Sequence, residues 1–238
     1  GTLIEPDALE LVALAEQLEL GLSALERDGR PADTALAGTV RISMADGFLR
    51  PMTCVLSELR RTHPGLHFEV VAETRAVDLT RREADLAIRT VRSSSQALVE
   101  RPAGRLQLGL YAAHSYVERH LRIPRIERRD FAHHDFVSQD GPPARSVQKK
   151  WLTEHGATRF VFRSNSDHAI EEAVLQGEGI CLMAKSSARP LPTLVELRCD
   201  VALPTVPVYV VFHRELRNVP RFRVVARELG TALRECLA

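Results

Sequence analysis

The hydrophobic positions after residue 37 alternate between two periods. Apolar residues recur at every second position over 40–44, as in a strand, and a turn at 45–47 leads to a helical spacing of three and four over 49–59. Residues 66–72 form the next predicted strand, 77–83 a helix and 85–89 a third strand. The order strand, helix, strand, helix, strand predicts a parallel sheet covered by helices.

The alternation of short apolar runs and helical spacing continues to the end of the chain. Further strands are predicted over 106–112, 136–138, 160–163, 180–183, 193–198 and 206–212. Further helices are predicted over 147–155, 168–176 and 220–236, and loops over 186–192 and 214–220. Two small α/β units in series are the simplest account of this order.

The segment from Phe162 to Met183 is an α/β crossover. Ser166 or Asp167 is a natural N-cap for its helix, and Gly177 supplies the left-handed residue that ends it. The sequence Gly177-Glu178-Gly179 closes a helix rather than opening one, which argues against a dinucleotide site.

The first 28 residues follow a different pattern. One apolar seam runs down a predicted helix, with residues spaced four and three apart: Ile4, Ala8, Leu11, Ala15, Leu18, Leu22 and Leu25. Such a helix could pack on its own domain or on a partner helix. The polar, proline-containing segment 29–37 resembles a hinge and favours the partner, so we predict a dimerisation helix over 1–28.

Composition indicates a folded protein of the cytoplasm. The chain has 238 residues, of which 45% are hydrophobic, and its 32 basic residues balance 31 acidic ones, so no phosphate-binding charge excess is present. Four dispersed cysteines indicate reduced thiols rather than a disulfide framework or a metal site. We expect no signal peptide and no membrane span.

The order of these segments resembles the effector-binding part of LysR-type transcriptional regulators. The matching pieces are the first strand at 38–43, Arg61-Thr62-His63-Pro64-Gly65 before the second, Glu83-Ala84-Asp85-Leu86-Ala87-Ile88 at the third, and 173–180 late in the chain. The predicted helix over 1–28 resembles the linker helix of that family, while its winged helix-turn-helix is missing from the printed sequence.

The resemblance implies an α/β fold of two Rossmann-like subdomains, similar to periplasmic binding proteins and preceded by the dimerisation helix. We expect the effector-binding domain over 38–238, with subdomain I over 38–112 and 207–238 and subdomain II over 113–206. The implied partners are a small-molecule effector, a second copy in a homodimer or homotetramer, and DNA through an N-terminal domain. No cofactor and no membrane partner are expected. The effector would act by shifting the population of oligomer conformations.

Polar residues that follow the predicted strands are the candidate effector contacts, because ligands of open parallel sheets gather at the carboxyl ends of the strands. Five of them come directly after strands: Asp46, Thr74, Thr90, Ser138 and Gln139. By resemblance to the family, contacts are implied at Asp46, Thr74, Thr90, Pro143 and Ala144. For any one hydroxyl, capping of a helix is the alternative.

Asp46 stands where the family commonly has Ser or Thr. An ionised carboxylate only accepts hydrogen bonds. The effector would then bring a hydroxyl or amine to Asp46 instead of a plain carboxylate. The alternative is that Asp46 caps the helix that follows it and faces away from the cleft.

Other functional classes have weaker support. The sequence contains no Gly-x-Ser-x-Gly elbow, phosphate loop or His-Glu-x-x-His helix, so we do not expect an enzyme. His63 with His67 and the run His133-His134-Asp135 have no spacing that suits a tetrahedral metal site. A solute-binding protein of a transport system would share the two-subdomain fold and remains the alternative function.

Overall fold

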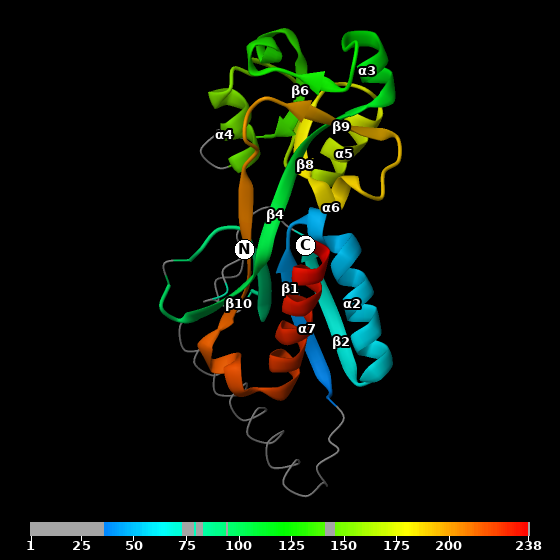
Figure 1. Ribbon diagram of the computed structural model, residues 1–238. Coiled ribbons are helices and arrows are strands. Elements are labelled where there is room, and N and C mark those ends of the chain that lie inside the picture. The colour runs from blue at the N-terminus through cyan, green and yellow to red at the C-terminus, as the bar shows by residue number, and fades with distance from the viewer. Residues whose placement is uncertain (1–35, 73–78, 80–82, 94, 141–145, 238) are drawn as a thin grey trace, which may run out of the picture. The chain divides into compact units, whose positions relative to one another are not determined.

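The computed structural model describes residues 36–72, 79, 83–93, 95–140 and 146–237 (Figure 1). By its internal contacts the chain divides into two units, residues 1–36 and 37–238, and the account below concerns the second. The predicted helix over 1–28 and most of the hinge over 29–37 lie outside the described residues, as does most of the predicted helix over 77–83.

The elements alternate along the chain as the hydrophobic pattern predicts. The strands are β1 (Gly38–Met44), β2 (Leu66–Ala72), β3 (Leu86–Arg89), β4 (Leu98–Ala113), β5 (Arg125–Ile126), β6 (Asp135–Gln139), β7 (Arg159–Ser164), β8 (Cys181–Ala184), β9 (Leu194–Cys199) and β10 (Thr205–His213). The helices are α2 (Leu49–Thr62), α3 (His114–His120), α4 (Val147–Glu154), α5 (Asp167–Leu175), α6 (Lys185–Ala188) and α7 (Pro220–Leu237), with 3-10 turns η1 (Asp46–Phe48), η3 (Arg128–His133) and η5 (Arg214–Asn218).

The first three strands form the predicted parallel sheet. β1 pairs in parallel with β2 on one side, where Val40 is opposite Phe68, and with β3 on the other, where Ile42 is opposite Leu86. β10 then adds antiparallel to β3. These strands together with α2 and α7 are called the β1 half below.

A second group of elements forms the β6 half, which comprises α3 to β9. β6 and β7 pair in parallel as a separate two-stranded sheet, while β8 and β9 pair with the end of β4. Figure 1 shows β4 running from the β1 half into the β6 half, with β10 beside it for part of this course. The two α/β units are therefore joined by a shared antiparallel pair.

The strand predicted over 106–112 is longer than the sequence pattern suggested. β4 begins at Leu98, and its first part pairs with β10 from Leu98 opposite His213 to Gln107 opposite Thr205. Polar residues such as Glu100, which is partly buried, and Arg105, which is exposed, interrupt the apolar pattern there. Backbone pairing with β10, and not apolar periodicity, makes this segment a strand.

Several short elements escaped prediction. α3 and β5 fall in stretches without a periodic apolar pattern, and α6 occupies the first part of the segment predicted as a loop over 186–192. η5 lies in the other predicted loop, 214–220. Elements of two to seven residues offer too few positions for a period to be read.

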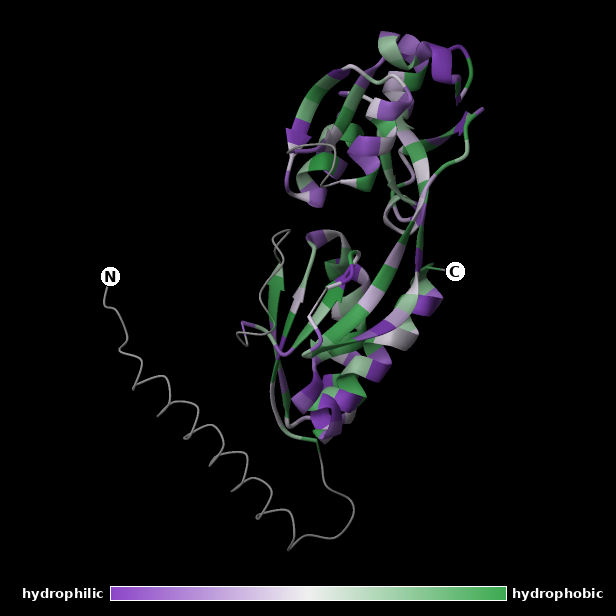
Figure 2. Ribbon diagram, turned by 90° about the vertical axis from the view of Figure 1, so that its left-hand side faces the viewer, coloured by the Kyte–Doolittle hydropathy of each residue, from purple (hydrophilic) through white to green (hydrophobic). Residues whose placement is uncertain are grey.

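Two helices cover one side of the sheet in the β1 half. α2 buries Met52, Leu56 and Leu59, α7 buries residues including Phe222, Val225 and Leu229, and the two helices pack against one another. Figure 2 shows the strands in mostly hydrophobic colours, while these helices carry both hydrophilic and hydrophobic residues. The β6 half has its own core around the aromatic rings of Phe131, Phe136 and Trp151.

Within the described residues, none of the helices has both the length and the apolar character that crossing a bilayer requires.

Candidate functional site

The carboxyl ends of β1 and β3 bring a serine and an arginine together. Ser43 is fully buried on β1, and the Nη2 group of Arg89 at the end of β3 donates to its Oγ over 3.1 Å. Burial lowers the pKa of the Arg89 guanidinium, because the charged form loses solvation. Thr90, a predicted effector contact, follows directly and is half-buried.

The end of β6 carries two more of the predicted contacts. Ser138 is 1% exposed, and its Oγ has no hydrogen-bond partner among the described residues. Gln139 accepts a hydrogen bond on Oε1 from the Oγ of Ser146, at 3.1 Å, and Ser146 in turn caps α4 by accepting from the Lys149 N–H. A buried hydroxyl without a partner costs free energy, so Ser138 is a group that a ligand could satisfy.

Asp46 connects the β1 half to the β6 half. It opens η1 directly after β1, and its carboxylate accepts from the Oγ of Ser166 at 2.6 Å, from the N–H of Asp167 at 3.0 Å and from the N–H of His168 at 3.4 Å. These donors belong to the N-terminus of α5, where free N–H groups and the helix dipole favour an anion. Asp46 therefore caps a helix, but a distant one rather than the helix that follows it.

The Asp167 side chain faces back toward Asp46. A Cβ atom at position 47 would lie 2.8 Å from Asp167 Oδ2, so the carboxyl group approaches the backbone of Gly47 closely. The Asp46 carboxyl and the Gln139 side chain both influence its pKa and therefore lie near it. Polar groups of both halves thus meet at this junction.

The two carboxyl groups differ in proton affinity. Burial raises the pKa of Asp167 to about 6, and the nearby charge of Asp46 adds to the effect. Burial also acts to raise the pKa of Asp46, but the donors from Ser166, Asp167 and His168 outweigh it and hold that pKa below its ordinary value. Asp46 is consequently the ionised member of the pair.

The structure places the predicted contacts unevenly. Asp46 and Gln139 both lie near Asp167, whereas Thr90 and Ser138 lie at the ends of β3 and β6, with no hydrogen bond to that pair among the described residues. Thr74, Pro143 and Ala144 lie outside the described residues. Sequence reasoning recognised Ser166 and Asp167 only as candidate caps of α5. The sequence could not show that the N-terminus of this helix, which favours an anion, faces the end of β1.

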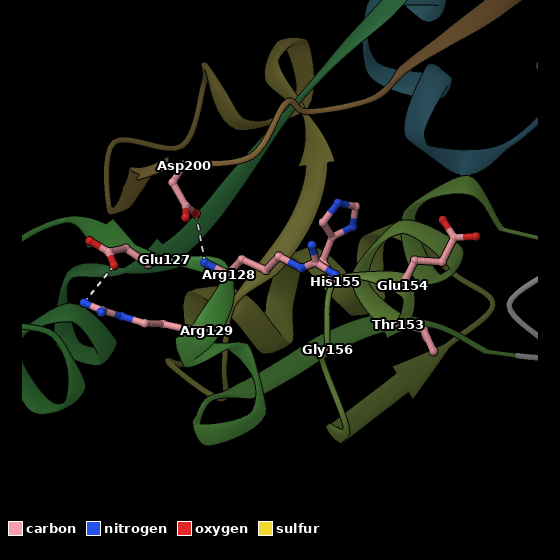
Figure 3. Close-up of a pocket in the computed structure, with 8 residues that line it drawn as sticks. All are labelled: Glu127, Arg128, Arg129, Thr153, Glu154, His155, Gly156 and Asp200. Carbon is pink, nitrogen blue, oxygen red and sulfur yellow. Dashed lines mark hydrogen bonds and ion pairs between the residues drawn. The ribbon is translucent and has the colours of Figure 1, made fainter.

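The β6 half also contains an open pocket of about 500 Å³ (Figure 3). Its lining comprises Glu127, Arg128, Arg129, Thr153, Glu154, His155, Gly156 and Asp200. Several of its charged side chains already have partners: Asp200 accepts from the Arg128 backbone N–H at 2.8 Å, and Arg129 lies 2.9 Å from Glu127. None of the predicted effector contacts lines it, so we place the candidate site at the strand ends.

The histidine clusters considered from the sequence serve other purposes. His63 is the C-cap residue of α2, and His134 Nδ1 lies 3.2 Å from the Tyr116 hydroxyl. Within the part of the chain that the structure describes, no group of three or more His, Cys, Asp or Glu residues is arranged to hold a metal ion.

Two α/β halves joined by shared strands, with polar residues at the strand ends, define an effector-binding domain of the periplasmic-binding-protein type. The family profile described as the LysR substrate binding domain matches residues 33–234, and the chain belongs to this family. The matched part corresponds to the effector-binding domain of LysR-type regulators, and a transport solute-binding protein is not favoured. The family consists of transcriptional regulators and is not a class of enzymes.

Individual relatives are distant. The chain is 26% identical over 183 residues to an HTH-type transcriptional regulator of Xanthomonas campestris, covering 74% of this chain and 52% of the relative. It is 26% identical over 117 residues to the uncharacterized HTH-type transcriptional regulator YhjC of Escherichia coli, covering 49% of this chain and 39% of the relative. The matches thus span about half or less of these relatives' length.

Solved structures share the fold. The regulatory domain of CrgA, a LysR-type regulator of Neisseria meningitidis, has a TM-score of 0.71 at 16% identity, over 85% of this chain and 100% of that one. The regulatory domain of MetR from the same genus has a TM-score of 0.66 at 16% identity, over 84% and 95% of the two chains. Full-length AphB of Vibrio cholerae has a TM-score of 0.66 at 18% identity, over 96% and 79%.

Proposed function

We propose that a small-molecule effector binds at the strand ends between the β1 half and the β6 half. The contacts are Asp46, Thr74, Thr90, Ser138, Gln139, Pro143 and Ala144. The single observation that carries this assignment is the bonding of Asp46, after β1, to the N-terminus of α5, because it brings strand ends of both halves to one place. The unpartnered, buried hydroxyl of Ser138 supports it.

The effector would bias the equilibrium between two orientations of the halves. The subdomain boundaries we propose are residues 38–112 with 207–238, and residues 113–206. A ligand shifts such an equilibrium only by its difference in affinity for the two orientations. Some of the proposed contacts belong to one half and some to the other. The orientation in which both sets reach the effector therefore binds the effector more tightly.

We infer the later steps of the mechanism, oligomerisation and DNA binding, from the family to which the chain belongs. In our proposal the helix over 1–28 pairs with that of a second copy, in a homodimer or homotetramer, and a DNA-binding domain reads the target sequence. The bias imposed by the effector then reaches DNA through the oligomer. Such a protein works in the cytoplasm, where the DNA of a bacterium lies. Its established relatives are transcriptional regulators, and we propose no catalytic role for this chain.

A thermal-shift screen tests the site. The full chain would be heated with aromatic acids, amino acids, amines and sugar acids, and a ligand should raise the melting temperature in proportion to the logarithm of its concentration. Thr90→Val and Ser138→Ala should weaken that ligand at least about tenfold in calorimetric titration, as expected for a lost hydrogen bond. Ser57→Ala, on the exposed surface of α2, is the matched control and should bind as the parent does. Equal binding by all variants would place the ligand elsewhere.

A further inference from the structure

Two carboxyl groups from opposite halves share one contact. Asp46 belongs to the β1 half and Asp167 to the β6 half. Asp46 Oδ1 accepts from the Asp167 N–H at 3.0 Å, and Asp167 Oδ2 lies 2.8 Å from the position of a Cβ atom on Gly47, so both carboxyl groups lie at one junction. Two ionised carboxylates at one place repel one another, and a proton on one of them removes that repulsion. The closed arrangement therefore favours a proton on the pair.

The surrounding hydrogen bonds decide which group carries this proton. Asp46 accepts from three donors of α5, namely Ser166 Oγ and the N–H groups of Asp167 and His168, all of which stabilise its charged form. Asp167 lies deeper and faces that charge. The proton accordingly resides on Asp167, and Asp46 remains the anion at the helix N-terminus.

Other charged groups lie on the elements around the pair. α5 carries His168 and Glu171, and Glu171 forms an ion pair with Arg50 of α2 at 3.8 Å. At the end of β3, Arg89 bonds to Ser43, three residues before Asp46.

β6 and β8 supply further groups. β6 contributes Gln139, followed by the exposed Asp140, and β8 contributes the buried thiol of Cys181. Of all these neighbours, His168 is the histidine that adjoins the pair in sequence, so its protonation has to be separated from that of Asp167.

We propose that the Asp46 and Asp167 pair makes the domain a sensor of acid, in which one proton on the pair stabilises the contact between the two halves and its loss leaves two neighbouring carboxylates that favour their separation. This function goes beyond effector binding, because the proton is the ligand and the contact involves no other molecule. It holds whether or not a small molecule binds at the strand ends.

The direction of the response follows from linkage. In the closed arrangement the pKa of Asp167 is about 6, against an ordinary value of 3.8 for a carboxyl exposed to water. Closure therefore takes up a proton between these two pKa values, so closing becomes more favourable as pH falls from about 6 toward 3.8, and this gain is lost once pH has risen through 6. A difference of about two pKa units corresponds to at most about a hundredfold change in the closing equilibrium.

A distance measurement between the halves tests the proposal. One spin label would be attached to the exposed Cys54 of α2 and one to Glu154→Cys on α4, with Cys199 and Cys236 replaced by Ser. Double electron–electron resonance on the full chain should give the largest population of a short distance near pH 4, a longer-distance population that grows as pH rises to about 6, and little further change up to pH 8.

Two variants distinguish the carboxyl pair from other titrating groups. In Asp167→Asn the amide donates to Asp46 without a charge, so the short distance should persist at pH 8. His168→Gln should respond as the parent does. A parent distance independent of pH, an unaltered response in Asp167→Asn, or loss of the response in His168→Gln would each overturn the proposal.

A measurement on the unaltered protein covers the case in which Asp167→Asn does not fold. The carboxyl ¹³C resonances of aspartate would be followed from pH 3 to 8. A resonance with a midpoint near 6 supports the proposal, and titration of every aspartate near the ordinary value would overturn it.

Discussion

Asp46 accepts a hydrogen bond from the backbone N–H of Asp167, 121 positions later in the chain, over 3.0 Å. The first residue lies directly after β1 and the second opens α5, so the bond joins the two halves of the effector-binding domain. Asp46 thereby occupies the helix N-terminus that would otherwise attract an anionic ligand. An anionic effector would have to displace this carboxylate, whereas a ligand with donors could bind beside it.

Ser166→Ala should destabilise the domain by about 1–2 kcal/mol, because it removes both the N-cap of α5 and a donor to Asp46. Urea unfolding followed by circular dichroism measures the change. Ser57→Ala on the exposed surface of α2 serves as the control and should leave the midpoint within error. Equal stability of both variants would mean that the Ser166 hydroxyl contributes nothing to this contact.

Gly47→Ala should destabilise the domain because its Cβ would lie 2.8 Å from Asp167 Oδ2. Removal of that carboxyl by Asp167→Ala should relieve the clash, so the double variant should be more stable than the sum of the two single changes by about 1 kcal/mol. Chemical denaturation of the four proteins gives this coupling. If the two changes in the free energy of unfolding simply add, a Cβ atom at position 47 does not contact the Asp167 carboxyl group.

Gly177→Ala and Gly156→Ala form a matched pair. Both glycines have positive φ, at 78° and 98°, so each substitution strains the backbone by about 1 kcal/mol. A Cβ at 177 would also lie 2.6 Å from Ser115 Oγ, whereas one at 156 meets nothing within 4 Å. We therefore expect Gly177→Ala to cost about 1 kcal/mol more in thermal or urea unfolding. The reverse order would contradict this packing.

Cys54 and Cys181 should differ in reactivity toward an alkylating reagent. Burial raises the pKa of the Cys181 thiol to about 12, so it holds its proton well above pH 8, while Cys54 is exposed on α2. Mass spectrometry after brief treatment at pH 8 should find modification at Cys54 and none at Cys181. Addition of denaturant supplies the control, because Cys181 should then react as well.

The sequence predicted two alternative roles for Asp46. Its carboxylate could accept a hydrogen bond from a donor on the effector, or it could cap the helix that follows it. In the structure α2 begins at Leu49, its N-cap residue Phe48 makes no side-chain hydrogen bond, and the Asp46 carboxylate instead caps α5. Capping chemistry was foreseeable from the residue type. The identity of the capped helix was not, because it depends on how the two halves meet.

The sequence by itself determined the order of elements around β1, α2, β2 and β3, the position of the helix cap at Ser166 or Asp167, and the left-handed Gly177, because these depend on periodicity and backbone preferences within a few positions. Tertiary structure alone decided the full length of β4 and the meeting of Asp46, Gly47 and Asp167. Leu98 to Gln107 is a strand because β10 satisfies its backbone groups. Asp46 and Asp167 lie more than 100 positions apart in the chain, and the fold brings them together. No local sequence pattern predicts such a contact.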